Sequence, residues 1–230
     1  MYNASYNLMI KKKKLTVIIP VRSGSTRVKN KNIRKFSNTS LLEIKIKQLK
    51  RIHDVDEIIV SSDSIKMLKL AKKLKVTTHK REPFYASTKA NNSDFFHNLA
   101  SFIKSDYIMY APVTSPLLLD KTIEGCINFL KKSNHKFKSV ATSKIVKEHM
   151  WLNNKPYNYI LKNAPSSQDL PDIMSITFGC CVLKRSDMLK FRNVLTNKTK
   201  LIPLTDLESI DVDTVMEFEM AEFFFNKYRK

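Results

Sequence analysis

Short runs of apolar, β-branched residues alternate with stretches of helical periodicity along the first half of this 230-residue chain. The runs are typical of strands buried in a parallel sheet, and they are Leu15–Pro20, Glu57–Ser61, Val76–His79 and Tyr107–Ala111. The helical stretches repeat apolar residues every three or four positions, and they are Leu41–Ile52, Ile65–Leu74 and Asp94–Ile103. This alternation predicts an α/β fold with a doubly wound, mostly parallel sheet and right-handed crossovers.

The alternation breaks in the second half of the chain. We expect Lys138–Met174 to form an inserted segment of strands and loops, suited to a lid or to a dimer contact. A strand returns at Thr177–Leu183, and Thr214–Glu217 has the Thr-x-x-Glu pattern of a capping box that begins a final helix. Since neither an internal repeat nor a long linker interrupts the chain, we expect a basic tail over residues 1–14 and one domain over residues 15–230.

Composition excludes several classes of protein. With 43% hydrophobic residues the chain can bury a core, which excludes a disordered protein. The formal charge of +20 suits nucleic acid, but the cations are spread over the whole sequence and no nucleic-acid-binding motif occurs, so we expect diffuse attraction for nucleotides and no specific nucleic-acid partner. No apolar run approaches the ~20 residues of a membrane span. Three cysteines without a disulfide framework or a zinc pattern favour a cytoplasmic protein.

A basic loop follows the first strand directly. Residues Arg22–Lys35 contain six cations and no acid. Gly24 allows a sharp turn, and its neighbours Ser23 and Ser25 offer hydroxyl and amide donors, so the loop can cradle a polyphosphate with charge supplied by Arg22 and Lys31. Ligands of such sheets bind beyond the carboxyl ends of the strands, where this loop lies. The alternative is a solvated basic loop, since neither a Walker A motif nor a GxGxxG motif is present.

Two aspartates, Asp211 and Asp213, stand immediately before the final helix. In extended backbone a D-x-D pair places both carboxylates on one side. Such oxygen ligands suit Mg²⁺, which binds one or two carboxylates together with phosphates and waters. The alternative is that the pair only favours the positive end of the helix dipole. Seven of the 21 acidic residues lie between Asp206 and Glu222, and this concentration in a basic chain favours a site for Mg²⁺ with a triphosphate.

Five motifs occur in a fixed order, and they are I18-I-P-V-R-S-G-S-T-R-V-K-N-K-N32, I58-I-V-S-S-D63, R81-E-P-F-Y-A-S87, T114-S-P-L117 and D211-V-D-T214. In this order they resemble the acylneuraminate cytidylyltransferase family, which includes the CMP-sialic acid synthetases and their relatives for other acidic nonulosonates and for 3-deoxy-octulosonate. The resemblance covers residues 15–228. It implies a Rossmann-like nucleotidyltransferase fold, a homodimer, and a Mg²⁺-dependent reaction in which CTP and an acidic sugar give a CMP-sugar and pyrophosphate.

The resemblance also implies roles for single residues. The catalytic residues would be Arg22, Lys31 and Asp211. The nucleotide would be bound by Arg22, Ser23, Gly24, Ser25, Lys31, Asn32, Arg81, Ala90, Asn91 and Asn92. The acceptor would be bound by Thr114, Ser115, Gln168 and Phe178. The metal would be bound by Asp211 and Asp213.

The acceptor half departs from the pattern of the sialic acid synthetases. Their Ser-Lys-Gly in the first loop is Ser25-Thr26-Arg27 here, a form that looks more like the 3-deoxy-octulosonate and pseudaminate branches. Pro112 replaces a glutamine, Phe178-Gly179 replaces Asn-Gly, and Ser167 replaces an arginine of the acceptor site. We therefore expect N-acetylneuraminate to be a poor acceptor, because a site that lacks donors complementary to a polar ligand discriminates strongly against it.

Two other functions stay open. One is a nucleotidyltransferase that uses a different base or a different acidic acceptor, such as a phosphonate. The other is a non-catalytic relative that only binds nucleotides or polyanions. The presence of Arg22, Lys31, Asp211 and Asp213 together argues against the second, because binding alone does not require a metal pair.

Overall fold

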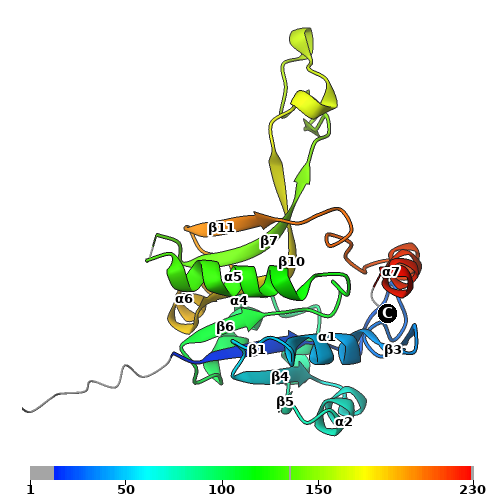
Figure 1. Ribbon diagram of the computed structural model, residues 1–230, viewed down its shortest axis with the longest axis vertical. Helices are drawn as coiled ribbons and strands as arrows, with labels where there is room; N and C mark the ends of the chain where they lie inside the picture. The colour runs from blue at the N-terminus through cyan, green and yellow to red at the C-terminus, as the bar shows by residue number, and fades with distance from the viewer. Residues whose placement is uncertain (1–12, 135, 229–230) are drawn as a thin grey trace, which may run out of the picture.

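The described part of the computed structural model, residues 13–134 and 136–228, forms a body of layered helices and strands from which a narrow arm projects (Figure 1). Apart from Lys13 and Lys14, the basic tail expected at residues 1–14 lies outside the described residues. None of the helices described is both long enough and apolar enough to cross a membrane. All three cysteines are buried and free.

Seven strands form the central sheet, in the order β11-β7-β10-β6-β1-β4-β5. They are β1 (Leu15–Pro20), β4 (Glu57–Ser62), β5 (Thr77–Lys80), β6 (Tyr107–Tyr110), β7 (Ser139–Val146), β10 (Ile173–Lys184) and β11 (Thr199–Pro203). Neighbouring strands are parallel except where β10 pairs antiparallel with β6 and β7. The predicted α/β class and the mostly parallel sheet are confirmed.

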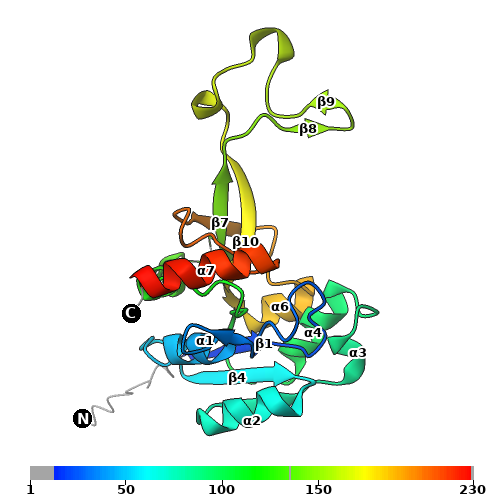
Figure 2. The ribbon, with the colours of Figure 1, turned by 90° about the vertical axis from the view of Figure 1, so that its right-hand side faces the viewer.

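Helices cover both faces of this sheet (Figures 1 and 2). They are α1 (Leu41–Leu49), α2 (Ile65–Lys73), α3 (Pro83–Ala86), α4 (Asn92–Ser101), α5 (Asp120–Lys132), α6 (Arg185–Phe191) and α7 (Val215–Tyr228). Because successive side chains of a strand point to opposite faces, Val17 and Ile19 of β1 join one core with α1, α2, α5 and α7, whereas Ile18 joins a second core with α4 and α6.

The predicted capping box is present at the start of α7. The Glu217 backbone N–H donates to Thr214 Oγ1 at 3.2 Å, and the Thr214 backbone N–H donates to Glu217 Oε2 at 2.7 Å. Such reciprocal bonds satisfy donors that a helix terminus otherwise leaves unpaired. They also fix the direction in which the D-x-D segment enters the helix.

Residues 138–174, the expected inserted segment, include β7 and the start of β10, two strands of the seven-stranded sheet. Residues 139–146 form β7 and β10 already begins at Ile173, so the part outside the central sheet is residues 147–172. The far ends of β7 and β10 leave the sheet as a two-stranded ribbon, and residues 147–172 form the arm at its tip (Figure 2). The arm contains the hairpin of β8 (Trp151–Leu152) and β9 (Lys155–Pro156), followed by the short 3-10 helices η1 (Leu161–Asn163) and η2 (Ser167–Asp169).

β7 carries hydroxyl groups at three of its five buried positions. Ser139, Thr142 and Ser143 are fully buried, and each of their hydroxyls is hydrogen-bonded to a neighbouring strand or loop. The hydroxyl of Ser139, for example, lies 2.6 Å from that of Thr199 at the start of β11. Buried hydroxyls are tolerated when they are hydrogen-bonded. A strand that buries them has fewer apolar residues, and its burial is therefore harder to predict from the sequence.

A two-stranded ribbon, β2 (Lys35–Phe36) and β3 (Thr39–Ser40), leads into α1.

Candidate active site

The candidate residues gather at the carboxyl ends of the parallel strands. The basic loop follows β1 at Val21, whose backbone N–H donates to the Ser61 carbonyl of β4 at 3.0 Å. Arg81 follows β5, and Thr114 belongs to the loop after β6. The topology therefore brings these segments to one edge of the sheet, as the sequence predicts for a ligand site.

The basic loop is shaped by its own polar side chains. The backbone N–H and the hydroxyl of Ser23 both donate to the Asp63 carboxylate, and the Asn32 side-chain amide donates to the Arg22 carbonyl at 3.0 Å. The predicted turn at Gly24 differs from expectation, because Gly24 does not have a positive φ. A Cβ atom at Gly24 would meet nothing within 4 Å, so this position borders open space and its backbone needs no glycine.

A small cationic pocket joins the basic loop to the D-x-D segment. Its volume is about 230 Å³, and its lining includes Arg22, Ser25, Arg27, Lys31, Asn32 and Asp213. Lys31 Nζ lies 3.1 Å from Asp213 Oδ1 and 2.6 Å from the Val212 carbonyl oxygen, and Arg27 Nη2 lies 3.0 Å from Asp213 Oδ2. Two cations therefore already meet one carboxylate in the pocket.

The two aspartates have different surroundings. Burial raises the pKa of Asp211, and the charges of Asp213 and Glu217 act in the same direction, against a hydrogen bond from Thr114. At Asp213 partial burial also raises the pKa, but Lys31 and Arg27 outweigh it and hold the pKa below the usual range. Asp213 is therefore the more firmly ionised of the two at neutral pH.

The donor set fits Mg²⁺ only with help from a ligand. The described residues contain no group of three or more His, Cys, Asp or Glu side chains that could hold a metal ion by themselves. Asp211 and Asp213 supply two carboxylates, and Mg²⁺ commonly binds one or two carboxylates and completes its shell with phosphate oxygens and waters. The pair thus fits a metal that arrives with a polyphosphate, and it does not fit a permanently bound ion.

A second pocket adjoins the first and shares Pro20, Val21 and Arg22 with it. Its volume is about 420 Å³, and its lining includes Arg22, Arg81, Tyr85, Ser87, Thr88, Ala90, Asn92, Phe95 and Tyr110. Arg22 Nη1 donates to the Ala86 carbonyl at 3.2 Å, at the boundary between the pockets. Aromatic faces beside hydroxyl and amide groups suit a heteroaromatic base and its ribose.

Arg81 lies at the floor of this second pocket and is almost completely buried. Its guanidinium donates to the carbonyls of Val21 and Ser61 and to the Ser61 hydroxyl, and it lies over the Phe95 ring at 5.1 Å from the centroid. Burial lowers the pKa of Arg81 to about 10, so it keeps its charge at neutral pH. Arg81 therefore ties the ends of β1 and β4 together as it lines the pocket. Asn91, by contrast, caps α4 by accepting the Asp94 backbone N–H at 2.8 Å.

Three of the four predicted acceptor residues come together. The Val212 backbone N–H donates to the Thr114 carbonyl at 2.8 Å, and the Ser115 hydroxyl lies 3.4 Å from Asp211 Oδ1. Gly179 packs so tightly on Ser115 that a Cβ atom would lie 3.0 Å from Ser115 Oγ. Phe178, at φ 56°, belongs to the irregular part of β10 and precedes this contact.

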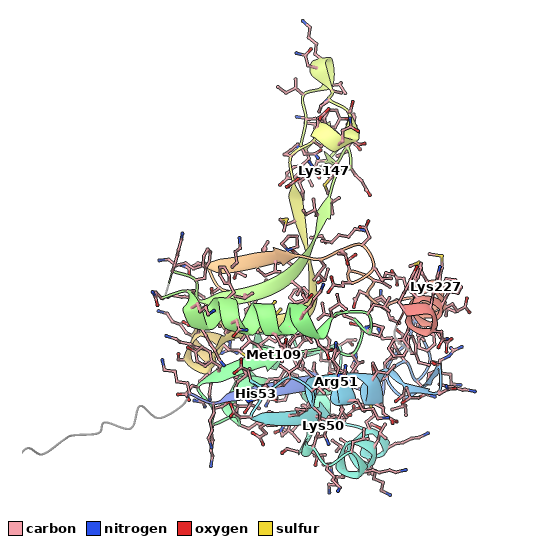
Figure 3. The ribbon with its side chains drawn as sticks, viewed as in Figure 1. Lys50, Arg51, His53, Met109, Lys147 and Lys227 are labelled. Atoms are coloured by element: carbon pink, nitrogen blue, oxygen red, sulfur yellow. The ribbon has the colours of Figure 1, made fainter. Side chains whose placement is uncertain are left out.

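The structure does not bring Gln168 to this group within one chain. Gln168 lies in η2 on the arm, where its carbonyl accepts a hydrogen bond of 3.0 Å from Lys147 Nζ. Figure 3 labels Lys147 on the arm, well away from the central sheet.

Sequence reasoning missed two buried polar residues beside the site, Lys45 and Gln48 of α1. Lys45 Nζ donates to the Ser115 carbonyl at 3.1 Å, and Gln48 Nε2 donates to the Leu118 carbonyl at 2.6 Å. The signal was present in the helical periodicity, since Lys45 stands three residues after Leu42 and therefore on the apolar face of the helix.

Comparisons with known proteins agree with this geometry. Residues 16–210 match a family model described as cytidylyltransferase. The post-translational flagellin modification protein B of Campylobacter coli is 25% identical over 222 residues, which cover 89% of this chain and 92% of that protein. An uncharacterised protein of Methanocaldococcus jannaschii is 31% identical over 137 residues, and the match covers 58% of this chain and about half, 53%, of that protein.

Solved structures show the same fold at low identity. A 4-diphosphocytidyl-2C-methyl-D-erythritol synthase from Anaerococcus prevotii has a TM-score of 0.69 at 14% identity, with 93% of this chain and 96% of that chain covered. A CMP:2-keto-3-deoxy-manno-octonic acid synthetase complexed with CTP has a TM-score of 0.67 at 10% identity, with 94% and 99% covered. The fold therefore agrees with the family model, and since that model spans most of the sequence, this chain belongs to the cytidylyltransferase family.

Proposed function

We propose that the protein transfers CMP from CTP to an acidic sugar of the nonulosonate or 3-deoxy-octulosonate type and releases pyrophosphate. The observation that carries this proposal is the pair of adjoining pockets that share Arg22. One has the size and the aromatic and polar lining for a nucleoside, and the other is cationic and ends at Asp213. Further support comes from the name of the Campylobacter coli relative, a flagellin modification protein, and from the octulosonate synthetase of the same fold.

In the proposed reaction a hydroxyl oxygen of the acceptor attacks the α-phosphorus of CTP. The new P–O bond forms as the bond from the α-phosphorus to the oxygen bridging to the β-phosphorus breaks. Pyrophosphate leaves with that oxygen, and the proton of the acceptor hydroxyl passes to solvent water. This chemistry needs alignment and neutralisation of charge rather than a covalent intermediate. Arg22 and Lys31 supply positive charge at the pocket where the triphosphate would lie.

Mg²⁺ is part of the proposal. Asp211 and Asp213 would hold it, and when bound it would neutralise phosphate charge. Lys31 and Arg27 keep Asp213 ionised, so this carboxylate is ready to accept a cation. The oxygens of a metal-bound triphosphate would then take the place of Asp213 as partners of Lys31 and Arg27.

The acceptor would lie between the Thr114–Ser115 loop and the Phe178 bulge of β10. Phe178 is 37% exposed and offers an aromatic face where a polar donor would otherwise stand. Because unpaired polar groups of a ligand are costly to bury, this surface disfavours N-acetylneuraminate and favours an acidic sugar with other substituents.

We also infer a homodimer in which the arm is the contact. Trp151, Leu152, Tyr157, Ile160 and Leu161 of the arm are all more than half exposed, and Ile160 reaches 75%. Such a concentration of exposed apolar side chains on a projecting segment is typical of an interaction surface. A second copy of the chain is the occupant that we propose.

The test is pyrophosphate release from CTP in the presence of Mg²⁺ and a panel of acidic acceptors. We expect saturable release with one of the sugars and little with UTP or ATP. Release only with a phosphonate acceptor would assign a different acceptor class. CTP binding without release from any acceptor would favour the non-catalytic alternative.

A further inference from the structure

A lysine lies completely buried under the candidate active site. Lys45 projects from α1 into the core and is 0% exposed. Its ammonium donates to two neutral oxygens, Gln48 Oε1 at 2.8 Å and the Ser115 carbonyl at 3.1 Å. A buried cation is costly unless the structure gives it hydrogen bonds. One of the two oxygens belongs to α1 itself, and the other belongs to the loop after β6.

The loop that receives this bond is residues 114–119, between β6 and α5. Helix α1 holds the loop at two carbonyls, through Lys45 at Ser115 and through Gln48 at Leu118. From another direction the Glu208 carboxylate accepts the Leu119 backbone N–H at 3.2 Å. Charged and polar side chains from other segments therefore fix the loop at Ser115, Leu118 and Leu119.

The same loop holds the D-x-D segment on its opposite side. The Thr114 carbonyl accepts the Val212 backbone N–H at 2.8 Å, and the Ser115 hydroxyl lies 3.4 Å from Asp211 Oδ1. A single residue, Ser115, thus connects the ammonium of Lys45 with the carboxylate of Asp211. Lys45 itself lies beneath the loop and does not line either pocket.

Burial of this charge is unfavourable for the fold. Desolvation lowers the pKa of Lys45 to about 8, although the charges of Asp120 and Asp211 act against this effect. Hydrophobic residues of similar volume often replace a buried charge without loss of stability. Lys45 thus lowers the stability of the core and at the same time fixes a loop of the candidate active site. Residues that break a packing rule in this way are expected at functional sites.

We propose that Lys45 is a positioning residue for Asp211. Its buried ammonium fixes the Ser115 carbonyl, and this contact sets the position of the loop to which the D-x-D segment is hydrogen-bonded. This inference rests on the proposed function only for the effect on turnover. The effect on the loop is a property of the protein without any ligand.

The experiment compares Lys45→Met with Lys47→Met. Lys47 is an exposed lysine on the same helix, and it pairs with Glu43 at the surface. The first measurement is amide hydrogen exchange without substrate. In Lys45→Met we expect exchange at the Val212 amide to become at least about tenfold faster, while the amides of β1 keep their rates. Lys47→Met should match the wild type at every amide.

The second measurement is steady-state kinetics at a temperature far below unfolding. We expect Lys45→Met to lower kcat by about tenfold or more and to change KM for CTP by less than about twofold, because the nucleotide pockets stay intact. Lys47→Met should keep both constants.

An unchanged exchange rate at Val212 would overturn the proposal, and so would a lower melting temperature with normal kcat. If Lys45→Met does not fold, Lys45→Gln decides by the same two measurements, since the amide removes the charge and keeps a shorter donor. Failure of the proposed function is distinguishable from failure of this inference. If the wild-type protein has no transferase activity, hydrogen exchange at Val212 alone decides whether Lys45 positions the loop.

Discussion

At the scale of residues, the cations of the basic loop are not equivalent. Arg22 and Lys31 line the cationic pocket, whereas Lys29 and Lys35 are exposed. We expect Arg22→Ala and Lys31→Ala each to lower kcat/KM about a hundredfold, since loss of a charge-assisted contact in such a site costs about 3 kcal/mol. Lys29→Ala and Lys35→Ala are the controls and should be mild. Equal small effects at all four positions in the pyrophosphate assay would indicate diffuse electrostatics.

Lys45 gives the protein a pH dependence of stability. Burial lowers its pKa in the folded state to about 8, against an ordinary value of 10.5. Above pH 8 the folded state therefore binds fewer protons than the unfolded state, and the free energy of unfolding rises between about pH 8 and 10.5. Urea unfolding at pH 7.5 and pH 10 measures this, and the rise should be smaller in Lys45→Met. Parallel curves for the two proteins would show that Lys45 does not titrate differently in the folded state.

Residue roles in the site were partly predictable. The charge pattern indicated Arg22, Lys31 and Asp213, and the structure places all three around one pocket. The side chains of Asn32 and Asn91 form hydrogen bonds with the backbone. Asn32 donates to the Arg22 carbonyl in the basic loop, and Asn91 accepts the Asp94 N–H at the start of α4. Such uses depend on where a carbonyl or an N–H points after folding, and a sequence does not display that.

At the scale of elements, a close approach of two segments sets up a test. A Cβ atom at Gly179 would lie 3.0 Å from Ser115 Oγ and 3.2 Å from its Cβ, so in Gly179→Ala the Ser115 side chain or its loop must shift by a few tenths of an ångström. We expect a loss of about 1–3 kcal/mol in the free energy of unfolding and weaker acceptor turnover. Gly125→Ala is the control, because a Cβ there meets nothing within 4 Å and alanine favours helix α5 by up to about 1 kcal/mol. Equal stability of both variants would contradict the packing described.

The elements were predictable where burial is apolar. β1 and β4 each contain a buried apolar run, Val17–Ile19 and Ile58–Val60, and the periodicity of α1 and α2 matches the faces that they bury. The sequence pattern does not indicate α5, α6 or β11, and β7 falls inside the expected inserted segment of residues 138–174. For β7 the reason is physical, since three of its five buried positions carry paired hydroxyls and only two carry apolar side chains.

At the scale of the whole molecule, the arm predicts association. Its exposed apolar residues, Trp151 and Ile160 among them, have no cover within the described part of the chain. Light scattering at micromolar concentration should give the mass of a dimer, and Trp151→Ser combined with Ile160→Ser should shift the protein toward the monomer. The monomer mass for the wild type would contradict the proposed homodimer.

If the two pockets at the sheet edge perform cytidylyl transfer, ³¹P NMR of a single reaction mixture will show both products. With CTP, Mg²⁺ and the correct acidic sugar, the α-phosphorus resonance should become that of a phosphodiester while pyrophosphate appears in equal amount. N-acetylneuraminate should give little product. Asp211→Asn, which keeps the shape of the side chain and removes its charge, should give none while it melts near the wild-type temperature. Unchanged CTP with every acidic sugar, or full conversion by Asp211→Asn, would contradict the account.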